Sequence, residues 1–195
     1  MLQYEKLVLG ELQTNCYLIW ETATKETLII DPADDGVGIS EIIESKQLKP
    51  VAILATHGHF DHVMGALDLK LIYNIPFYCS SLDQFLLDRQ AETAKHFLKH
   101  NIKVPNFRQI DVDLDKTDKV SFLELIKLPG HTPGSVGFYN KENGWLFSGD
   151  VIFEDMVGRT DTKYGSKEDL NKSIIQIKKL GEVTIFPGHG NNFEL

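Results

Sequence analysis

The sequence predicts an α/β protein in which two central sheets are flanked by helices. Short apolar runs that are typical of strands alternate with segments of helical periodicity. The alternation falls into two rough halves, and each half begins with strands and closes with helices. The chain has 195 residues, 42% of them hydrophobic, and contains neither a Ser/Gly/Pro-rich linker nor a repeat of fixed period. We therefore expect residues 1–195 to form one domain with a substantial core.

The first half is expected to start with three strands, LVLGEL, NCYLIWE and TLIID, which are separated by turn residues. Helical spacing follows at Ile39, Ile42, Ile43 and Leu48. The run VAILAT (51–56) is short and continuously apolar, which is typical of a strand buried on both faces. The remaining elements of this half are a short helix over 62–71, a strand over 76–79 and a helical segment over 81–99.

The second half contains four expected strands and one helix. The strands cover 120–128, 135–140, 144–150 and 183–186, and the last of them leads into PGHG. In the helical segment 166–180, Ser166 is the expected N-cap and Asp169 follows three residues later, an acidic variant of the capping box. One apolar stripe runs along this helix, through Leu170, Ile174, Ile177 and Leu180.

Composition disfavours several classes of partner and compartment. The formal net charge of −8 argues against sequence-independent binding of nucleic acid, which needs a basic face. No apolar run approaches the roughly 18 residues that span a bilayer, and the N-terminus lacks a basic n-region, so we expect neither a membrane segment nor a signal peptide. The two cysteines, Cys16 and Cys79, give no disulfide framework and favour a reducing, cytoplasmic location. The sequence leaves the oligomeric state open.

The stretch THGHFDH (56–62) is the most informative part of the chain. It brings together His57, His59, Asp61 and His62 in a protein with only seven histidines. Neutral imidazole and carboxylate are ligands for zinc and similar metals. Without a metal the cluster is costly, because protonated histidines repel one another. The alternative is a helix N-cap at Asp61 with solvated histidines nearby. The density of ligand types favours a metal site.

Three later residues of ligand type also follow apolar strand runs. His131 lies in KLPGHTPGS, Asp150 ends GWLFSGD, and His189 lies in VTIFPGHG. Taken alone, each would be an ordinary turn residue. If the four strands lie side by side in the same sense, however, their C-terminal ends converge on one edge, where α/β proteins usually place their chemistry. His96 and His100 fit no motif and are expected to form a solvated surface pair.

The pattern HxHxDH followed by a distant His, Asp and His resembles the metallo-β-lactamase superfamily of hydrolases, over most of the chain as far as Gly190. The resemblance implies the metallo-β-lactamase fold, a four-layer αββα sandwich. It also implies two divalent metal ions, zinc in the first place, with iron and manganese as alternatives. The implied ligands form two groups of three joined by a bridge: His57, His59 and His131; Asp61, His62 and His189; and Asp150 as the bridging carboxylate. Asp61 is also the expected catalytic residue, because it can orient the nucleophile.

The stretches LQTNCYLI, FSGDVIF and GRTD resemble the short glyoxalase II-like proteins, relatives of hydroxyacylglutathione hydrolase. This implies hydrolysis of small acyl thioesters such as S-lactoylglutathione. Arg159 matches a basic position that helps to bind glutathione; the alternative is a turn residue paired with Asp161. Asp150 stands where several β-lactamases carry cysteine, which disfavours antibiotic hydrolysis. The competing interpretation is an oxidoreductase with a single iron, similar to the persulfide dioxygenases.

Two features bear on the substrate. No general acid is evident in the motif regions, and this favours a thiolate leaving group, which needs little protonation. After His189 the chain continues with Gly190-Asn191-Asn192 and ends at Leu195. Glyoxalase II has an aromatic residue soon after this histidine and a helical domain that grips glutathione, and we expect neither here. We therefore expect an open pocket on that side and weak recognition of the thiol half.

Overall fold

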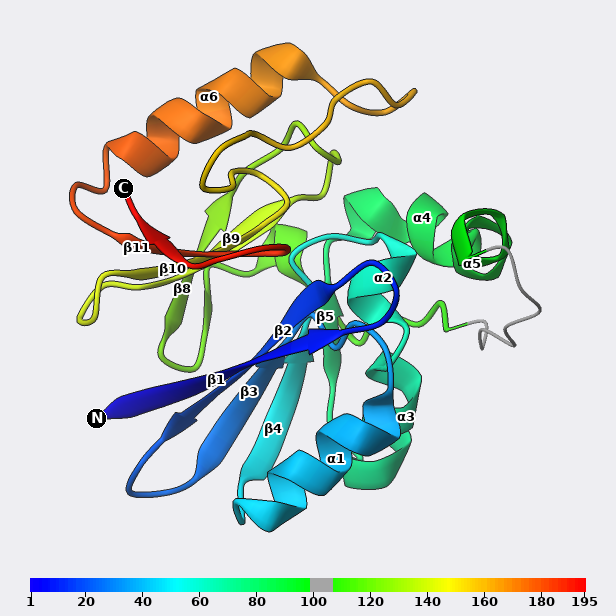
Figure 1. The fold of residues 1–195 in the computed structure, drawn as a ribbon, viewed down its shortest axis with the longest axis vertical. Helices are drawn as coiled ribbons and strands as arrows, with labels where there is room; N and C mark the ends of the chain where they lie inside the picture. Colours follow the sequence, from blue (N-terminus) through cyan, green and yellow to red (C-terminus); the bar gives the residue numbers. More distant parts are fainter. Residues whose placement is uncertain (99–106) are drawn as a thin grey trace.

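The computed structural model describes residues 1–98 and 107–195, and its first sheet is built from the N-terminal half of the chain (Figure 1). Six strands lie in the order β1-β2-β3-β4-β5-β6. They are β1 (Leu2–Leu9), β2 (Thr14–Glu21), β3 (Glu26–Ile30), β4 (Lys49–Leu54), β5 (Phe77–Cys79) and β6 (Val112–Asp113). The first three strands are antiparallel, whereas the pairs from β3 to β6 are parallel and need helical crossovers.

The second sheet is built from the C-terminal half and also has six strands, in the order β12-β11-β10-β9-β8-β7. They are β7 (Lys119–Val120), β8 (Leu123–Lys127), β9 (Val136–Asn140), β10 (Trp145–Gly149), β11 (Thr184–Pro187) and β12 (Phe193–Glu194). Only β10 and β11 are a parallel pair, and α6 (Lys167–Lys178) makes the crossover between them.

The layers are explained by the side chains of the central strands, which point alternately to the two faces of each sheet. On β2, Tyr17 and Ile19 point into a core between the two sheets, while Cys16 and Leu18 point into a second core on the outer side. Helices α1 (Gly36–Ser45) and α3 (Ala66–Tyr73) cover that outer side, and α6 covers the outer side of the second sheet (Figure 1). The four-layer αββα sandwich is therefore confirmed, with the chain's two cysteines buried as free thiols in β2 and β5.

The helices that follow the first ligand loop are shorter than the sequence predicted. The expected helix over 62–71 is two helices, α2 (Phe60–Val63) and α3. They are separated at Gly65, whose N–H donates to the Pro32 carbonyl at 2.9 Å. A Cβ at Gly65 would lie 2.5 Å from that carbonyl oxygen, so the contact requires glycine. The expected segment over 81–99 is divided as well. It comprises a 3-10 turn η1 (Ser81–Asp83), α4 (Gln84–Asp88) and α5 (Gln90–Leu98). A second 3-10 turn, η2 (Leu114–Lys116), follows β6.

Two predicted strands have different bounds in the structure, and two further strands were not predicted. The first strand ends at Leu9 instead of continuing to residue 12, because Gly10 and Gln13 have φ values of 68° and 53° and form a turn. The run 120–128 is a hairpin of β7 and β8 that turns at Ser121, φ 52°. β6 and β12 contain two residues each, too few to produce a periodic pattern.

The second-half helix agrees with its prediction in both capping and burial. Ser166 is the N-cap of α6, and its side chain accepts a hydrogen bond from the Asp169 N–H at 3.2 Å. Leu170 and Ile177 are buried against the second sheet. Because the Ser166 N–H donates to the Gly130 carbonyl at 2.8 Å, the start of α6 also supports the loop that carries His131.

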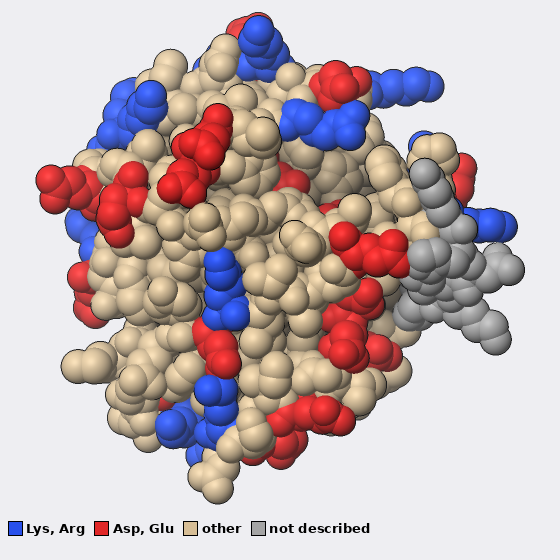
Figure 2. Space-filling model, viewed as in Figure 1, with Lys and Arg blue, Asp and Glu red and all other residues tan. Residues whose placement is uncertain are grey.

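Charged side chains of both signs are scattered over the face of the molecule drawn in Figure 2. Lysines and arginines lie there singly or in small groups among acidic side chains. The absence of a nucleic-acid partner stays a prediction. Among the described residues, no helix has the length and apolar character to cross a membrane. His96 is exposed on α5, and His100 lies outside the described residues.

Candidate metal centre

The four strands that lead into the motif residues do not lie in one sheet. β4 belongs to the first sheet, whereas β8, β10 and β11 belong to the second. Within the second sheet these three strands run in the same direction, because β8 and β10 are both antiparallel to β9 and β11 is parallel to β10. The two sheets meet at this end, where the Val136 N–H donates to the Thr56 carbonyl at 2.9 Å. The motif residues therefore converge between two sheets and not along one sheet edge.

The first group of side chains consists of His57, His59 and His131. His59 Nδ1 lies 2.9 Å from His57 Nε2 and 3.0 Å from His131 Nε2. His57 and His131 are almost fully buried, at 1% and 3% exposure. Burial, and next His62, lower the pKa of His57 well below its usual value; burial, and next His131, lower the pKa of His59 to about 4. Both rings are therefore held neutral, the form that binds metals.

The second group consists of Asp61, His62 and His189. Asp61 Oδ2 lies 3.6 Å from His62 Nε2 and 3.4 Å from His189 Nε2. Asp150 stands between the groups, because its carboxylate oxygens lie 3.5 Å from His62 Nε2 and 3.6 Å from both His131 Nε2 and His189 Nε2. All seven residues that the sequence singled out as ligands therefore lie together in the structure.

Hydrogen bonds on the outer side of the rings fix which nitrogen faces the centre. His62 Nδ1 is 2.9 Å from Asp31 Oδ2, His131 Nδ1 is 2.9 Å from the Arg159 carbonyl, and His189 Nδ1 is 3.1 Å from the Leu12 carbonyl. Each partner can only accept, so each outer nitrogen carries the proton. The inner nitrogen of these three rings, Nε2, therefore faces the centre.

His57 is fixed in the same way through Thr56. The Thr56 hydroxyl donates to Asp31 Oδ2 at 2.7 Å and accepts from His57 Nδ1 at 3.1 Å. The Thr56 N–H also donates to Asp31 Oδ1 at 2.7 Å. Asp31, which follows β3, thus orients two rings of the motif loop. Carboxylates that orient ligating imidazoles in this way are the usual second layer of metal sites.

Two features of the centre indicate that it binds a cation. Two of its buried atoms, His62 Nε2 and Asp150 Oδ1, have no hydrogen-bond partner among the described residues. Buried polar atoms are rarely left unpaired without a functional reason. Burial alone would lower the pKa of His62, but Asp150, Asp61 and Asp31 outweigh it and raise that pKa well above its usual value. The carboxylates thus create a strong preference for positive charge at this point.

A buried carboxylate outside the motifs connects two of the ligand loops. Asp83 Oδ2 accepts from the Gly58 N–H at 2.9 Å and from the Thr132 hydroxyl at 2.7 Å, and Asp83 Oδ1 accepts from the Gly134 N–H at 2.8 Å. Its side chain is fully buried. Burial raises the pKa of Asp83, while the same three hydrogen bonds oppose that rise. Asp83 therefore fixes the His57–His59 loop relative to the His131 loop.

Sequence reasoning missed Asp31, Asp83 and Tyr164. Asp31 had a usable signal, since it ends the predicted strand TLIID. Asp83 and Tyr164 had none, because they follow no motif and reach the site only through the fold. The Tyr164 hydroxyl lies 2.8 Å from His59 Nε2, and burial raises the pKa of Tyr164, so the hydroxyl stays protonated near neutral pH.

Arg159 lies at the edge of the centre, but its guanidinium is already paired. The Arg159 side chain makes two hydrogen bonds to the Asp161 carboxylate, at 2.8 and 3.2 Å. This is the turn pairing considered as the alternative role. Arg159 nevertheless lines a pocket of about 370 Å³ over the centre, to which Leu12 and Phe97 add apolar walls. The structure is thus compatible with both roles of this arginine.

Comparison with known proteins decides the family. Residues 9–189 match the model of the metallo-beta-lactamase superfamily, a span that begins in β1 and ends at His189. The chain belongs to the metallo-β-lactamase superfamily. The metallo-β-lactamase fold implies binding of divalent metal, and the His/Asp cluster described above supplies suitable side chains.

Several relatives in this superfamily are similar over most of their length. The chain is 38% identical over 187 residues to the hydroxyacylglutathione hydrolase GloC of Haemophilus influenzae, covering 92% of this chain and 86% of that protein. Among solved structures, the BLEG-1 B3 metallo-beta-lactamase superposes with a TM-score of 0.90 at 31% identity, covering 98% and 94% of the two chains. A di-iron-bound form of TTHA1623 superposes with a TM-score of 0.88 at 31% identity, covering 97% and 93%.

These relatives support a metal-dependent hydrolase of the superfamily and leave its substrate and metal undecided. The di-iron form of TTHA1623 means that iron, as well as zinc, is compatible with the centre of this chain. The similarity to a protein named as a β-lactamase weakens the argument that Asp150 disfavours antibiotic hydrolysis. β-Lactams therefore belong among the substrates to be tested.

Proposed function

We propose that the protein is a dinuclear metal-dependent hydrolase of small acyl thioesters. The observation that carries the proposal is the inward direction of Nε2 on His57, His62, His131 and His189, toward one centre. Each of these rings uses its outer nitrogen to donate a hydrogen bond within the protein. The inner nitrogens and the carboxylates of Asp61 and Asp150 then face one another, and bound cations would supply the positive charge that these carboxylates favour.

The proposed ligands divide between two ions as the distances suggest. His57, His59 and His131 would hold one ion, and Asp61, His62 and His189 would hold the other, with Asp150 shared between them. The ligand atoms of each group of three lie within 4.8 Å of one another. The carboxylate of Asp150 is suited to the bridging role because its two oxygens face rings of both groups.

When bound, divalent ions at such a site make water acidic enough to act as a nucleophile near pH 7 and polarise the carbonyl under attack. The protein's own groups would position the reactants. Asp61 is held by a hydrogen bond from the Thr14 hydroxyl at 3.1 Å and is proposed to orient the attacking water. Leu12 and Phe97 line the pocket and would exclude bulk water from a small acyl group.

A chemical reason and a family reason favour thioesters as substrates. A thiolate leaving group needs little protonation, since thiols have a pKa of about 8.5. The relative from Haemophilus influenzae is named for the hydrolysis of a hydroxyacyl thioester. We accordingly propose S-lactoylglutathione and simpler hydroxyacyl thioesters as substrates, with zinc as the first metal to test.

A panel of substrates on protein loaded separately with zinc, manganese or iron tests this function. The panel contains S-lactoylglutathione, a neutral lactoyl thioester, a lactone and a β-lactam, each assayed with and without oxygen. We expect the two thioesters to have the highest kcat/KM, with no dependence on oxygen. Oxygen consumption by protein with a single iron would support the dioxygenase-like alternative instead. A kcat/KM for the β-lactam above that for both thioesters would contradict the proposed substrate class.

A further inference from the structure

A second pocket opens beside the metal centre, on the far side of His59. It has a volume of about 400 Å³, comparable to the pocket over the centre itself. The two pockets share His59, Phe60, Thr93 and Tyr164 in their walls and are therefore neighbours. We call this space the side pocket. A small acyl group does not need this volume, and the thiol half of a thioester does.

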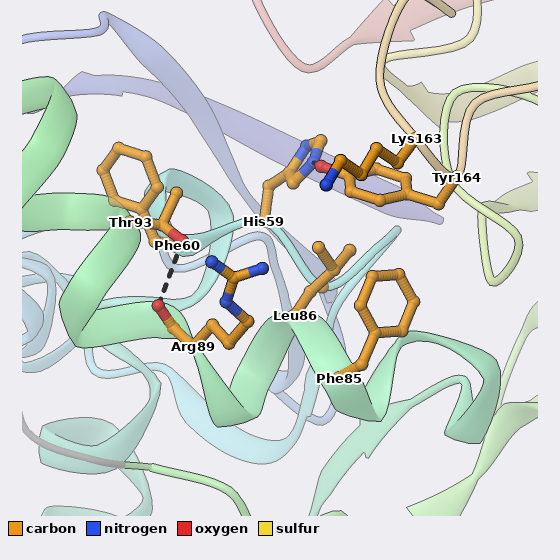
Figure 3. Close-up of a pocket in the computed structure, with 9 residues that line it drawn as sticks. His59, Phe60, Phe85, Leu86, Arg89, Thr93, Lys163 and Tyr164 are labelled. Atoms are coloured by element: carbon orange, nitrogen blue, oxygen red, sulfur yellow. Dashed lines mark hydrogen bonds between the residues drawn. The ribbon is translucent and has the colours of Figure 1, made fainter.

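Two cationic side chains enter the side pocket from opposite walls. Arg89, between α4 and α5, extends from the wall that carries Phe85 and Leu86, whereas Lys163 enters from the loop that carries Tyr164 (Figure 3). Among the described residues no ion pair forms with Lys163, so its charge is available to a ligand. Arg89 pairs with Glu92 at 3.2 Å, but both side chains are mostly exposed, at 65% and 70%. Exposed pairs of this kind are worth about 0–1 kcal/mol, so a ligand anion can compete for Arg89.

The remaining wall of the side pocket is apolar. The rings of Phe85 and Tyr164 meet edge to face at 5.1 Å between centroids, and Leu86 lies beside them (Figure 3). The Tyr164 hydroxyl is engaged by His59, so its ring is fixed between the metal centre and the side pocket. A ligand in the side pocket would therefore meet an apolar surface and two cationic side chains.

We infer that the side pocket is the subsite for an anionic thiol carrier, with Lys163 and Arg89 binding carboxylates or phosphates remote from the scissile bond. This inference rests on the proposed thioester hydrolysis for the identity of the ligand, although the pocket and its charges are independent of it. It revises the expectation that the thiol half is weakly recognised. The inference also assigns anion binding to Lys163 and not to Arg159, which lies on the same loop. Arg159 forms an ion pair with Asp161, whereas Lys163 has no ion-pair partner in the part of the chain that the structure describes.

The test measures binding and does not depend on turnover. Calorimetric titration of the metal-loaded protein would use two inert thioethers, S-methylglutathione for a carboxylate-bearing carrier and S-methyl coenzyme A for a phosphate-bearing one. We expect the Kd of the accepted probe to rise severalfold in Lys163→Gln and about tenfold in the double variant Lys163→Gln/Arg89→Gln, the loss of one or two charge-assisted contacts. It should also rise with salt concentration, since exposed charges are screened.

Lys179→Gln is the matched control, because it removes the same charge from the far end of α6, and its Kd should equal that of the wild type. In hydrolysis assays Lys163→Gln should raise the KM of an anionic thioester and leave the KM of a neutral one unchanged. If neither probe binds the wild type, or if binding is equal in the wild type and the double variant, the inference is wrong. Either binding result would refute the inference whether or not thioesters are hydrolysed, whereas a failed substrate panel alone would refute only the proposed function.

Discussion

At the scale of single residues, Asp83 is the side chain on which the relative position of two ligand loops depends. It is buried and accepts three hydrogen bonds, two from the backbone of Gly58 and Gly134 and one from Thr132. In Asp83→Asn, an amide N–H₂ would face one of these donors and leave it unpaired. Each unpaired buried donor costs about 1–3 kcal/mol.

We therefore predict that Asp83→Asn lowers the melting temperature of the metal-free protein and weakens metal binding about 10–100-fold, the usual effect of losing a group that orients ligands. Differential scanning calorimetry in chelator and a competition titration with a metal indicator measure the two effects. Asp88→Asn is the control, since Asp88 is exposed on α4 and, within residues 1–98 and 107–195, accepts a hydrogen bond from Gln84 alone. Metal affinity equal to that of the wild type would show that Asp83 does not hold the loops.

At the scale of elements, α6 should contribute to stability without taking part in metal binding at its C-terminal end. Ile177 is fully buried in the core between α6 and the second sheet, whereas the contacts with the His131 loop lie nearer the other end, at Ser166 and at Ser173, whose hydroxyl donates to the Pro129 carbonyl at 2.7 Å. Truncation of a buried isoleucine to alanine costs about 2–5 kcal/mol.

Ile177→Ala is thus predicted to lower the free energy of unfolding by that amount in urea titrations, with the metal content per folded chain unchanged. Ile175→Ala is the control on the same helix, because Ile175 is 55% exposed and its truncation should have little effect. A loss of bound metal in folded Ile177→Ala would mean that α6 is coupled to the centre along its whole length.

Some of the strands and helices could be predicted from the sequence and others could not. The core strands of both sheets were predicted because they are continuous apolar runs of about five residues, and α6 because its cap and its stripe agree. The short strands β6 and β12 carry no such pattern. The segment 81–99 was predicted as one helical segment, but Asp83 turns inward to the ligand loops and ends the 3-10 turn η1. Tertiary hydrogen bonds of this kind have no periodic signature.

At the scale of the whole molecule, the sandwich explains why the motif residues meet. The sequence predicted their convergence on one sheet edge, but the ligand loops come from two sheets that face each other. Backbone hydrogen bonds join the two sheets at this end. The Asn15 N–H of β2 donates to the Gly188 carbonyl at 2.7 Å, next to His189. The motif residues were recognisable from their chemistry. Of the groups that position them, Asp31 had a signal at the end of a predicted strand, whereas Asp83 and Tyr164 reach the site only in three dimensions.

The central claim is that these seven side chains hold two metal ions, and elemental analysis tests it most directly. Protein purified without chelator would be incubated separately with zinc, manganese and iron, freed of excess metal, and analysed for metal per chain. We predict two ions per chain for at least one metal, and a clear loss in Asp150→Ala, which removes the proposed bridge. One ion or fewer with all three metals would contradict the dinuclear site, as would two ions retained in full by Asp150→Ala.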